Sequence, residues 1–194
     1  MPPKFEVEKE VLPVDIARVL RRMGSWKAPG DDLLPIGLLK ACGKPLYEVL
    51  APLIEACLEL QWFPERFKCG KTIVLAKPGK KPADYQTPAG YRPIALLPTV
   101  GKVIEGLLAA RITYMAEAMG LLPEEQMGNR QYRSTKLAIR LVVAQVQEAW
   151  RQGFTPSLLQ LDISGAFDTV NHTRLLDTLR KYGFPGWLIR VLQS

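Results

Sequence analysis

The most informative stretch of the chain is Leu158-Leu159-Gln160-Leu161-Asp162-Ile163-Ser164-Gly165-Ala166-Phe167-Asp168-Thr169-Val170. Its leucines predict a buried strand over Ser157 to Asp162. Asp162 then stands where the strand leaves the core, and the small residues after it leave room for a bulky, charged substrate. Magnesium takes carboxylate and phosphate oxygens and is seldom held by protein alone. The stretch predicts one arm of a nucleotidyl-transfer site. A turn or helix-capping aspartate is the alternative that these residues leave open.

The composition of the 194 residues is that of a globular protein, with 47% hydrophobic and 23% charged residues. No apolar run approaches the roughly 18 residues of a membrane span, and the first residues lack the apolar core of a secretory signal. Cys42, Cys57 and Cys69 form no C-x-x-C pair, so we expect reduced thiols. The prediction is an intracellular protein without a membrane partner, in the nucleus or the cytoplasm.

Basic charge is concentrated in the middle of the chain. The formal net charge is +7, and Glu65 to Arg140 contains 13 Lys and Arg against 6 Asp and Glu. In the remaining segments the number of Lys and Arg equals the number of Asp and Glu. Such a concentration is typical of a surface that binds the phosphates of a nucleic acid. A solvated basic loop is the alternative that composition leaves open.

Periodicity and turn residues predict a mixed α and β chain. Two strands, Lys71–Lys77 and Tyr91–Leu97, flank a loop rich in Pro, Gly and Lys, and Pro93 marks the second as an edge strand or bends it. Pro52 should kink or split a helix. The expected helices are Pro13–Met23, Ile36–Cys42, Pro45–Gln61, Thr99–Met119, Ser134–Trp150, Asn171–Tyr182 and Pro185–Gln193.

The last predicted helix is apolar on one face, and the chain stops soon after it. We interpret this as a truncated domain, which leaves Trp187, Leu188 and Leu192 exposed. A terminal helix that packs back on the core is the alternative.

Four blocks in order give the chain a resemblance to the reverse transcriptases of non-LTR (LINE-type) retrotransposons. The likeness runs from about Trp26 to the end of the chain. The blocks are Lys27-Ala28-Pro29-Gly30-Asp31-Asp32-Leu33-Leu34-Pro35; residues 71–105, with Lys77-Pro78-Gly79-Lys80 and Tyr91-Arg92-Pro93-Ile94-Ala95-Leu96-Leu97-Pro98; Gln126-Met127-Gly128-Asn129-Arg130-Gln131-Tyr132-Arg133-Ser134-Thr135; and the Asp162 segment with Phe167-Asp168. In the third block Met127, Asn129 and Tyr132 stand where the family commonly has Phe, Phe and Gly.

The resemblance implies an α+β, right-hand polymerase fold. Residues 1–25 would be an N-terminal extension with a short helix, 26–157 a fingers-like region with the basic hairpin, and 158–194 the start of the palm. The rest of the palm and the thumb are missing, and the family's later Tyr/Phe-Ala-Asp-Asp hairpin does not occur in these 194 residues. We therefore expect this polypeptide alone to have no polymerase activity.

The resemblance also implies the site residues. Asp162 would be the first catalytic, metal-binding aspartate, with the carbonyl of Ile163 beside it, and the metal would be Mg²⁺ or Mn²⁺. Phe167 would lie under the incoming sugar and clash with a 2′-hydroxyl, with a core phenylalanine as the alternative. Lys77 and Arg92 would lie near the triphosphate. Further contacts to the nucleic acid would come from Lys71, Lys80, Lys81, Arg130 and Arg133.

The implied partners are an RNA template, a DNA primer and a deoxynucleoside triphosphate. Two alternatives stay open. One is a non-catalytic, nucleic-acid-binding remnant of a decayed retroelement, with the same basic surface and no metal. The other is an unrelated α/β enzyme with a lone magnesium-binding aspartate, which would need further acidic residues in neighbouring loops.

Overall fold

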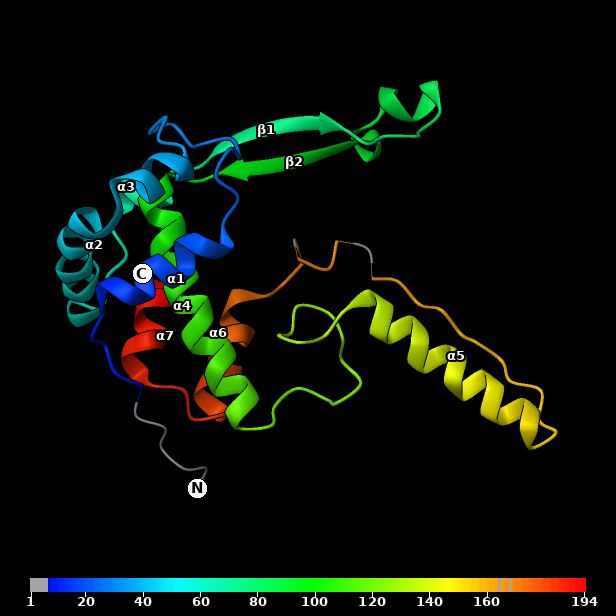
Figure 1. Cartoon of the computed structure of the whole chain (residues 1–194). Coiled ribbons are helices and arrows are strands. Elements are labelled where there is room, and N and C mark those ends of the chain that lie inside the picture. Colours follow the sequence, from blue (N-terminus) through cyan, green and yellow to red (C-terminus); the bar gives the residue numbers. More distant parts are fainter. Residues whose placement is uncertain (1–6, 164, 168) are drawn as a thin grey trace. The chain divides into compact units, whose positions relative to one another are not determined.

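The computed structural model describes residues 7–163, 165–167 and 169–194. The chain forms two compact units (Figure 1). The first contains the described residues up to Thr113 together with Leu176–Ser194, and the second is Tyr114–Leu175. No helix of the described residues is long and apolar enough to cross a membrane.

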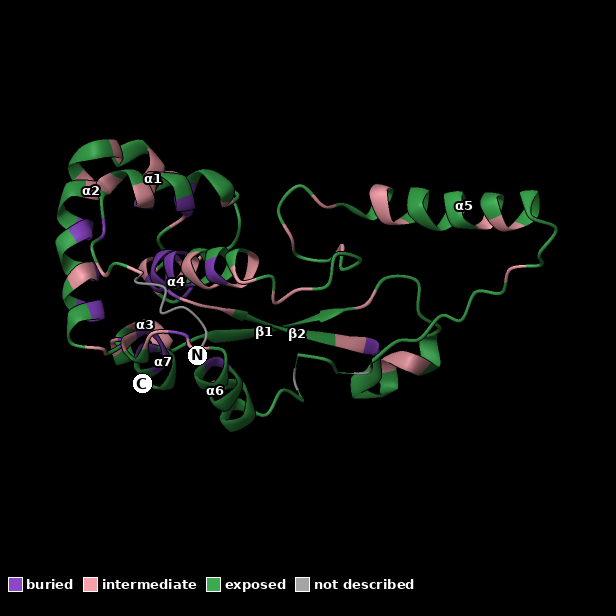
Figure 2. Cartoon of the chain, turned by 90° about the horizontal axis from the view of Figure 1, so that it is seen from below, coloured by how far each residue is buried: buried purple, intermediate pink, exposed green. Residues whose placement is uncertain are grey.

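Four helices build the core of the first unit: α1 (Pro13–Arg22), α2 (Ile36–Glu59), the first turns of α4 (Thr99–Ala118), and α7 (Gly186–Gln193). Buried residues gather on their facing sides (Figure 2). The side chains with almost no exposed surface include Ile16, Leu20, Ile54, Leu58, Val103, Ile104 and Leu188. Burial of these aliphatic groups is the main favourable term in folding.

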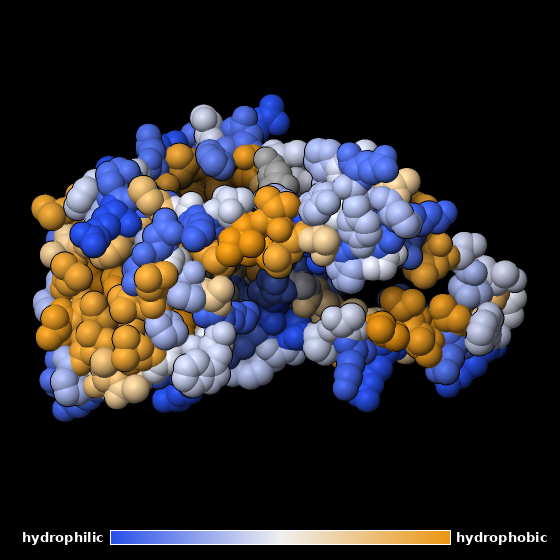
Figure 3. Space-filling model, turned by 90° about the horizontal axis from the view of Figure 1, so that it is seen from above, coloured by the Kyte–Doolittle hydropathy of each residue, from blue (hydrophilic) through white to orange (hydrophobic). Residues whose placement is uncertain are grey.

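The outer side of α2 stays apolar and uncovered. Leu38, Val49 and Leu53 are between 47% and 67% exposed, and Figure 3 shows hydrophobic side chains gathered on this side of the molecule. The predicted boundary between the helices Ile36–Cys42 and Pro45–Gln61 is confirmed, because Gly43 has a φ of 61° and divides α2. Glycine tolerates this left-handed angle because it has no Cβ. The predicted kink or split at Pro52 is wrong, since α2 runs through Pro52 with helical backbone angles.

The predicted strands pair as an antiparallel ribbon. β1 (Lys71–Ala76) and β2 (Tyr91–Leu96) follow the short helix α3 (Glu65–Lys68), and η1 (Pro82–Gln86) and η2 (Pro88–Gly90) connect them. Lys77 N donates to Gly90 O, and hydrogen-bonded pairs alternate along such a ladder. Counting from that hydrogen-bonded pair, Pro93 and Val74 form a non-hydrogen-bonded pair. Proline has no backbone N–H, so at this position it removes no hydrogen bond from the ladder. The prediction of an edge strand is confirmed.

The turn after α1 is tied to the start of α4. Asp32 Oδ2 accepts a hydrogen bond from Thr99 N, and the hydroxyl of Thr99, which is completely buried, donates to Leu34 O. A Cβ on Gly30 would lie 2.5 Å from Leu97 O. This turn therefore fixes the junction between β2 and α4.

Gly30→Ala is expected to destabilise the protein, because neither backbone can yield without breaking the hydrogen bonds at Thr99. Overpacking of this kind costs roughly 1–3 kcal/mol, which thermal unfolding detects as a lower Tm. Gly128→Ala is the matched control, since a Cβ there meets nothing within 4 Å. Equal Tm values for the two variants would show that the close approach at Gly30 is unimportant.

The second unit contains α5 (Thr135–Arg151), with no buried residue. Ser134 Oγ accepts from Leu137 N at 3.2 Å and caps α5, which begins where the sequence predicts a helix. The predicted buried strand over Ser157 to Asp162 is wrong. These residues have no regular secondary structure, and Leu158, Leu159 and Leu161 are 75–81% exposed. A strand needs a neighbour for its backbone hydrogen bonds, and no described segment pairs with this one.

α6 (His172–Lys181) begins as predicted, because Asn171 Oδ1 accepts from Arg174 N at 3.0 Å. The interpretation of an uncovered last helix is wrong for Leu188. Leu188, Ile189 and Val191 are buried, and α7 contacts α2. Trp187 is partly covered, with the guanidinium of Arg111 over its ring at 5.8 Å. The apolar face of α7 is therefore part of the core, and only Leu192 stays exposed, at 40%.

Candidate nucleotide and nucleic-acid site

Three predicted phosphate-binding residues lie on one face of the ribbon. Leu75 is opposite Arg92, and Lys71 is opposite Leu96. Side chains alternate between faces, so Lys71, Leu75 and Lys77 share a face with the residues opposite them. We call Lys71, Lys77 and Arg92 the cationic ribbon face. The family resemblance implied these three residues, and the register of the two strands places them on one face.

Hydrogen bonds and a ring contact hold the end of the ribbon around Lys77. Its Nζ donates to Ala89 O at 2.8 Å, and its carbonyl accepts from Tyr85 Oη at 2.7 Å. Tyr91 Oη donates in turn to Tyr85 O at 3.0 Å, and the two rings meet edge to face with centroids 6.0 Å apart. An ammonium has three donors, so Lys77 keeps two for a phosphate.

The cations of the ribbon face are not neutralised by the protein. Within the described ranges, no ion pair involves any of the three or the exposed loop residues Lys80 and Lys81. Arginine offers a planar fork to phosphate and lysine a mobile point charge. This surface can therefore bind the phosphates of a free nucleotide or those along a nucleic-acid strand.

Arg130 is engaged within the second unit. Its Nε donates to Glu117 Oε1 at 2.9 Å and its Nη2 to Glu117 Oε2 at 2.6 Å, and its side chain is only 10% exposed. Nη1 donates to Pro123 O. This bidentate pair fastens the loop before α5 to the end of α4. Arg133 and Tyr132, which is 91% exposed, lie just before the N-terminus of α5. Contact of Arg130 and Arg133 with a template stays a prediction.

The hydrogen bond from Arg130 lowers the pKa of Glu117 below its ordinary value. A depressed pKa means that the pair stabilises the folded loop above the ordinary glutamate pKa of about 4.3 and that this contribution is lost as the pH falls through the folded value. We expect amide hydrogen exchange in residues 119–133 to be faster at acid pH than its intrinsic rate explains.

Glu117→Gln should give that faster exchange already at neutral pH, with little further change on acidification. Glu148→Gln, which removes an ion pair to Arg151 within α5, is the control. Unchanged protection of residues 119–133 in Glu117→Gln would show that the pair does not hold the loop.

The Asp162 segment is open to solvent. Asp162 is exposed, Ile163 is 74% exposed and Phe167 is 85% exposed. Phe167 is therefore not a core residue in this structure. Ser164 and Asp168 lie outside the described residues. The predicted metal ligands, the carboxylate of Asp162 and the carbonyl of Ile163, therefore belong to exposed residues, and part of the segment that follows them lies outside the described residues.

A complete metal centre does not fit the residues that are present. Magnesium and manganese favour oxygen ligands, which Asp162 and Ile163 can supply. However, the described part of the chain has no group of three or more His, Cys, Asp or Glu side chains that could hold a metal ion. One carboxylate does not hold two ions, so no chemical step is assigned to a metal here.

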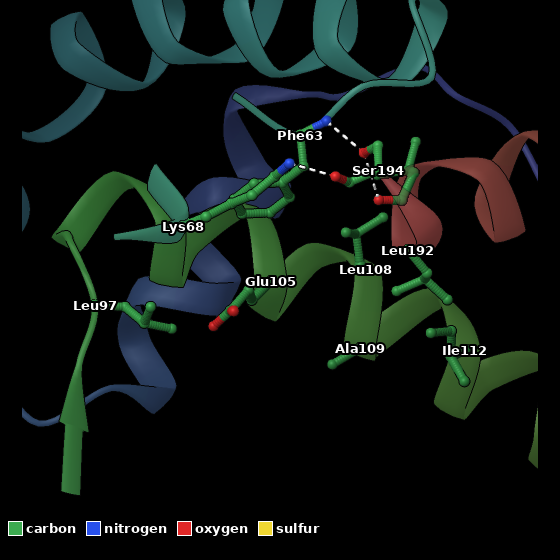
Figure 4. A pocket seen from close by; sticks show the side chains of 10 residues that line it. Phe63, Lys68, Leu97, Glu105, Leu108, Ala109, Ile112, Leu192 and Ser194 are labelled. Atoms are coloured by element: carbon green, nitrogen blue, oxygen red, sulfur yellow. Dashed lines mark hydrogen bonds between the residues drawn. The ribbon is translucent and has the colours of Figure 1, made fainter. Parts of the chain in front are cut away.

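A cavity of about 360 Å³ lies in the first unit between α4 and the chain's last residues (Figure 4). Leu108, Ile112 and Leu192 make its wall apolar, and Phe63 N donates to Ser194 Oγ at 2.8 Å. Partial burial raises the pKa of Glu105, which also lines the cavity, and Lys102 opposes the shift. This cavity could not be predicted from the sequence, because the residues that line it come from separate segments of the chain.

Comparison with known proteins identifies the family of this chain. A model of the reverse transcriptase (RNA-dependent DNA polymerase) family matches residues 76–193. The chain belongs to this family. The predicted resemblance to non-LTR retrotransposon enzymes is confirmed by its relatives.

Three relatives come from Drosophila melanogaster. The probable RNA-directed DNA polymerase from transposon X-element is 38% identical over 163 residues, which cover 84% of this chain and 18% of that protein. The RNA-directed DNA polymerase from mobile element jockey is 30% identical over 180 residues, covering 93% of this chain and 19% of that protein. The putative 115 kDa protein in type-1 retrotransposable element R1DM is 32% identical over 186 residues, covering 94% and 17%. The chain thus spans less than a fifth of the length of these relatives.

Proposed function

We propose that this chain supplies the fingers and the first palm segment of an RNA-directed DNA polymerase of a non-LTR retrotransposon. Residues 26–157 form the fingers, 158–194 begin the palm, and 1–25 are an extension. The partners are an RNA template, a DNA primer and a deoxynucleoside triphosphate. The observation that carries the proposal is the cationic ribbon face, whose charges the described protein leaves unpaired.

In this proposal the ribbon holds phosphates. Lys77 and Arg92 share a face near the ordered end of the hairpin, so one phosphate chain can contact both. Two cations on the triphosphate neutralise charge that builds up during phosphoryl transfer. Lys71 is farther along the same face, and Lys80 and Lys81 are exposed in the loop; they contact the backbone of the template–primer.

Asp162 is the first catalytic carboxylate in this proposal, and it and the carbonyl of Ile163 are ligands of Mg²⁺ or Mn²⁺. The exposed ring of Phe167 is free to lie under the incoming sugar. The exposed leucines at 158, 159 and 161 favour a segment that gains neighbours. We propose that these neighbours, and the other metal ligands, come from further palm residues of a longer polymerase.

Binding of a labelled RNA–DNA hybrid to the purified 194-residue chain tests the proposal. The logarithm of the binding constant should fall linearly with the logarithm of the salt concentration, because the cations of the protein release counterions from the nucleic acid. Binding without salt dependence, or no binding at about 50 mM salt, would contradict it. With Mg²⁺ and deoxynucleotides the same chain should not extend the primer, since one aspartate cannot hold two ions. Extension that Asp162→Ala abolishes would overturn that part.

A further inference from the structure

The outer side of α2 carries a row of apolar side chains that the described protein leaves uncovered (Figure 3). They are exposed and recur at spacings of three to four residues, which places them on one face of a helix. They are Pro45, Val49, Pro52, Leu53, Ala56 and Leu60. The opposite side of the helix packs in the core through Leu50, Ile54 and Leu58. We call the exposed row the α2 face. Contiguous apolar patches of this kind mark interaction sites.

The polar groups beside the α2 face are hydrogen-bond acceptors. Residues 45–60 contain Glu48, Glu55 and Glu59 but no Lys or Arg, although the whole chain has a net charge of +7. Pro52 adds a further acceptor. Because proline has no N–H, the carbonyl of Glu48, four residues earlier, lacks its usual helical donor. A partner of this face must therefore supply donors and positive charge.

The protein's own cations satisfy the glutamates only weakly. Lys44 Nζ lies 3.4 Å from Glu48 Oε1, and Lys9 Nζ lies 2.9 Å from Glu59 Oε2. The side chains of Glu48 and Glu59 are 54% and 57% exposed, and ion pairs between exposed side chains contribute little to stability. A cation from a partner can therefore join or replace these lysines at small cost.

We propose that the α2 face binds an amphipathic helix of a separate protein, with apolar side chains on one side and Lys or Arg along its edge. An apolar helix surface of this length pairs with another helix through anchors at the same three- and four-residue spacing. A second copy of the chain would place acceptors against acceptors, and a nucleic acid would bring phosphates, which are also acceptors. The inference goes beyond the proposed function, because no residue of the α2 face belongs to the ribbon or to the Asp162 segment.

Anisotropy titrations of the 194-residue chain with two labelled 18-residue helical peptides test the α2 face. Both peptides have leucines on one side, and the other side has lysines in one peptide and glutamates in the other. The lysine peptide should bind at least about 10-fold more tightly. The net charge of +7 would favour the glutamate peptide, so a preference for lysine requires the local acceptors of α2.

Two double variants separate the apolar contacts from the charge. Val49→Ser with Leu53→Ser should weaken binding of the lysine peptide roughly 10-fold or more, because the burial of two apolar side chains is lost. Glu48→Gln with Glu59→Gln should reduce the preference for the lysine peptide to about 2-fold or less. All four side chains are exposed, and circular dichroism verifies that each variant is folded.

Ile139→Ser with Val143→Ser is the matched control. These side chains are 59% and 47% exposed on α5, close to the 67% of Val49 and 47% of Leu53. However, α5 contains three Lys and Arg residues and one acidic residue. The control variant should therefore bind the lysine peptide within about 2-fold of the unaltered chain.

Equal affinity of the unaltered chain for the two peptides would overturn the inference. So would binding of the lysine peptide that Val49→Ser with Leu53→Ser leaves within about 2-fold. A dimer that light scattering detects and this variant abolishes would instead assign the face to a second copy, and a loss of RNA–DNA hybrid binding in this variant would assign it to nucleic acid. Either result would contradict a basic protein partner.

The same titration is repeated with a chimera in which the chain replaces the matching part of the X-element polymerase. The lysine peptide should bind this chimera within about 3-fold of its affinity for the 194-residue chain, because a separate partner needs the face to be free. Loss of binding in a folded chimera would show that other segments of a polymerase cover the α2 face, and would overturn the inference of a separate partner.

Discussion

Asp162→Ala is expected to lower primer extension roughly 1,000-fold or more in a chimeric polymerase. In this chimera the chain replaces the matching part of the X-element polymerase, over the 163 aligned residues. Stabilisation of phosphoryl charge by a metal ion is worth several kcal/mol, and each ~1.4 kcal/mol is a factor of ten in rate. Extension of an RNA-templated DNA primer is measured in single-turnover conditions with Mg²⁺.

The effect should be confined to the chemical step. Asp162 is exposed, so its replacement should not unfold the chain, and template–primer affinity should change by less than about 2-fold. Asp177→Ala is the control, because Asp177 is a surface acid paired to Arg180 on α6. If the Asp162→Ala chimera keeps more than about a tenth of its extension rate, Asp162 is not the metal-binding aspartate.

The double reversal Lys77→Glu with Arg92→Glu should weaken binding of the RNA–DNA hybrid roughly 100-fold at about 50 mM salt. Two phosphate contacts are lost and two repulsive charges are added on one face of the ribbon. Each lost contact lowers the salt slope by about 1, so the slope should fall by at least 2. Anisotropy titrations at several salt concentrations measure both quantities.

A change of net charge elsewhere provides the comparison. Arg18→Glu with Lys44→Glu alters the total charge equally, but these side chains are on α1 and α2, each near an acidic partner. This variant should bind the hybrid almost as the unaltered chain does. If both double variants lose affinity to the same extent, binding depends on net charge and the ribbon face is not a site.

Local signals predicted the elements well. β-branched residues and a turn-rich loop predicted the ribbon, and Ser134 and Asn171 predicted two helix starts because a side-chain cap acts within three residues. Lys77 and Arg92 were assigned to one neighbourhood through the family resemblance, and the register of the ribbon was known only from the structure.

Features that depend on distant partners could not be predicted. The leucines at 158, 159 and 161 have the composition of a strand but are exposed, because no described segment pairs with them. Leu188 is buried because α2 covers the face that seemed free in the sequence. The break of α2 at Gly43 was predicted as a helix boundary, whereas the kink or split predicted at Pro52 does not occur.

The candidate sites also depend on residues that are distant in the sequence. Arg130 and Glu117 are 13 residues apart in the sequence. This spacing matches no helical or strand period, so their ion pair could not be predicted. A groove of the first unit combines residues from 22 to 109, among them Lys27 and Ile94 of two different sequence blocks, and neither block alone shows that they meet. The basic residues could be identified from the sequence, but the side chains that pair with them or lie beside them could not.

Primer extension by the chimera with the unaltered chain distinguishes part of a polymerase from a decayed remnant, because a remnant would bind nucleic acid without supporting chemistry. We expect Mg²⁺-dependent incorporation of deoxynucleotides on an RNA template, as with the parent polymerase in the same assay. A folded chimera that binds the template–primer but adds no nucleotide, while the parent does, would contradict it.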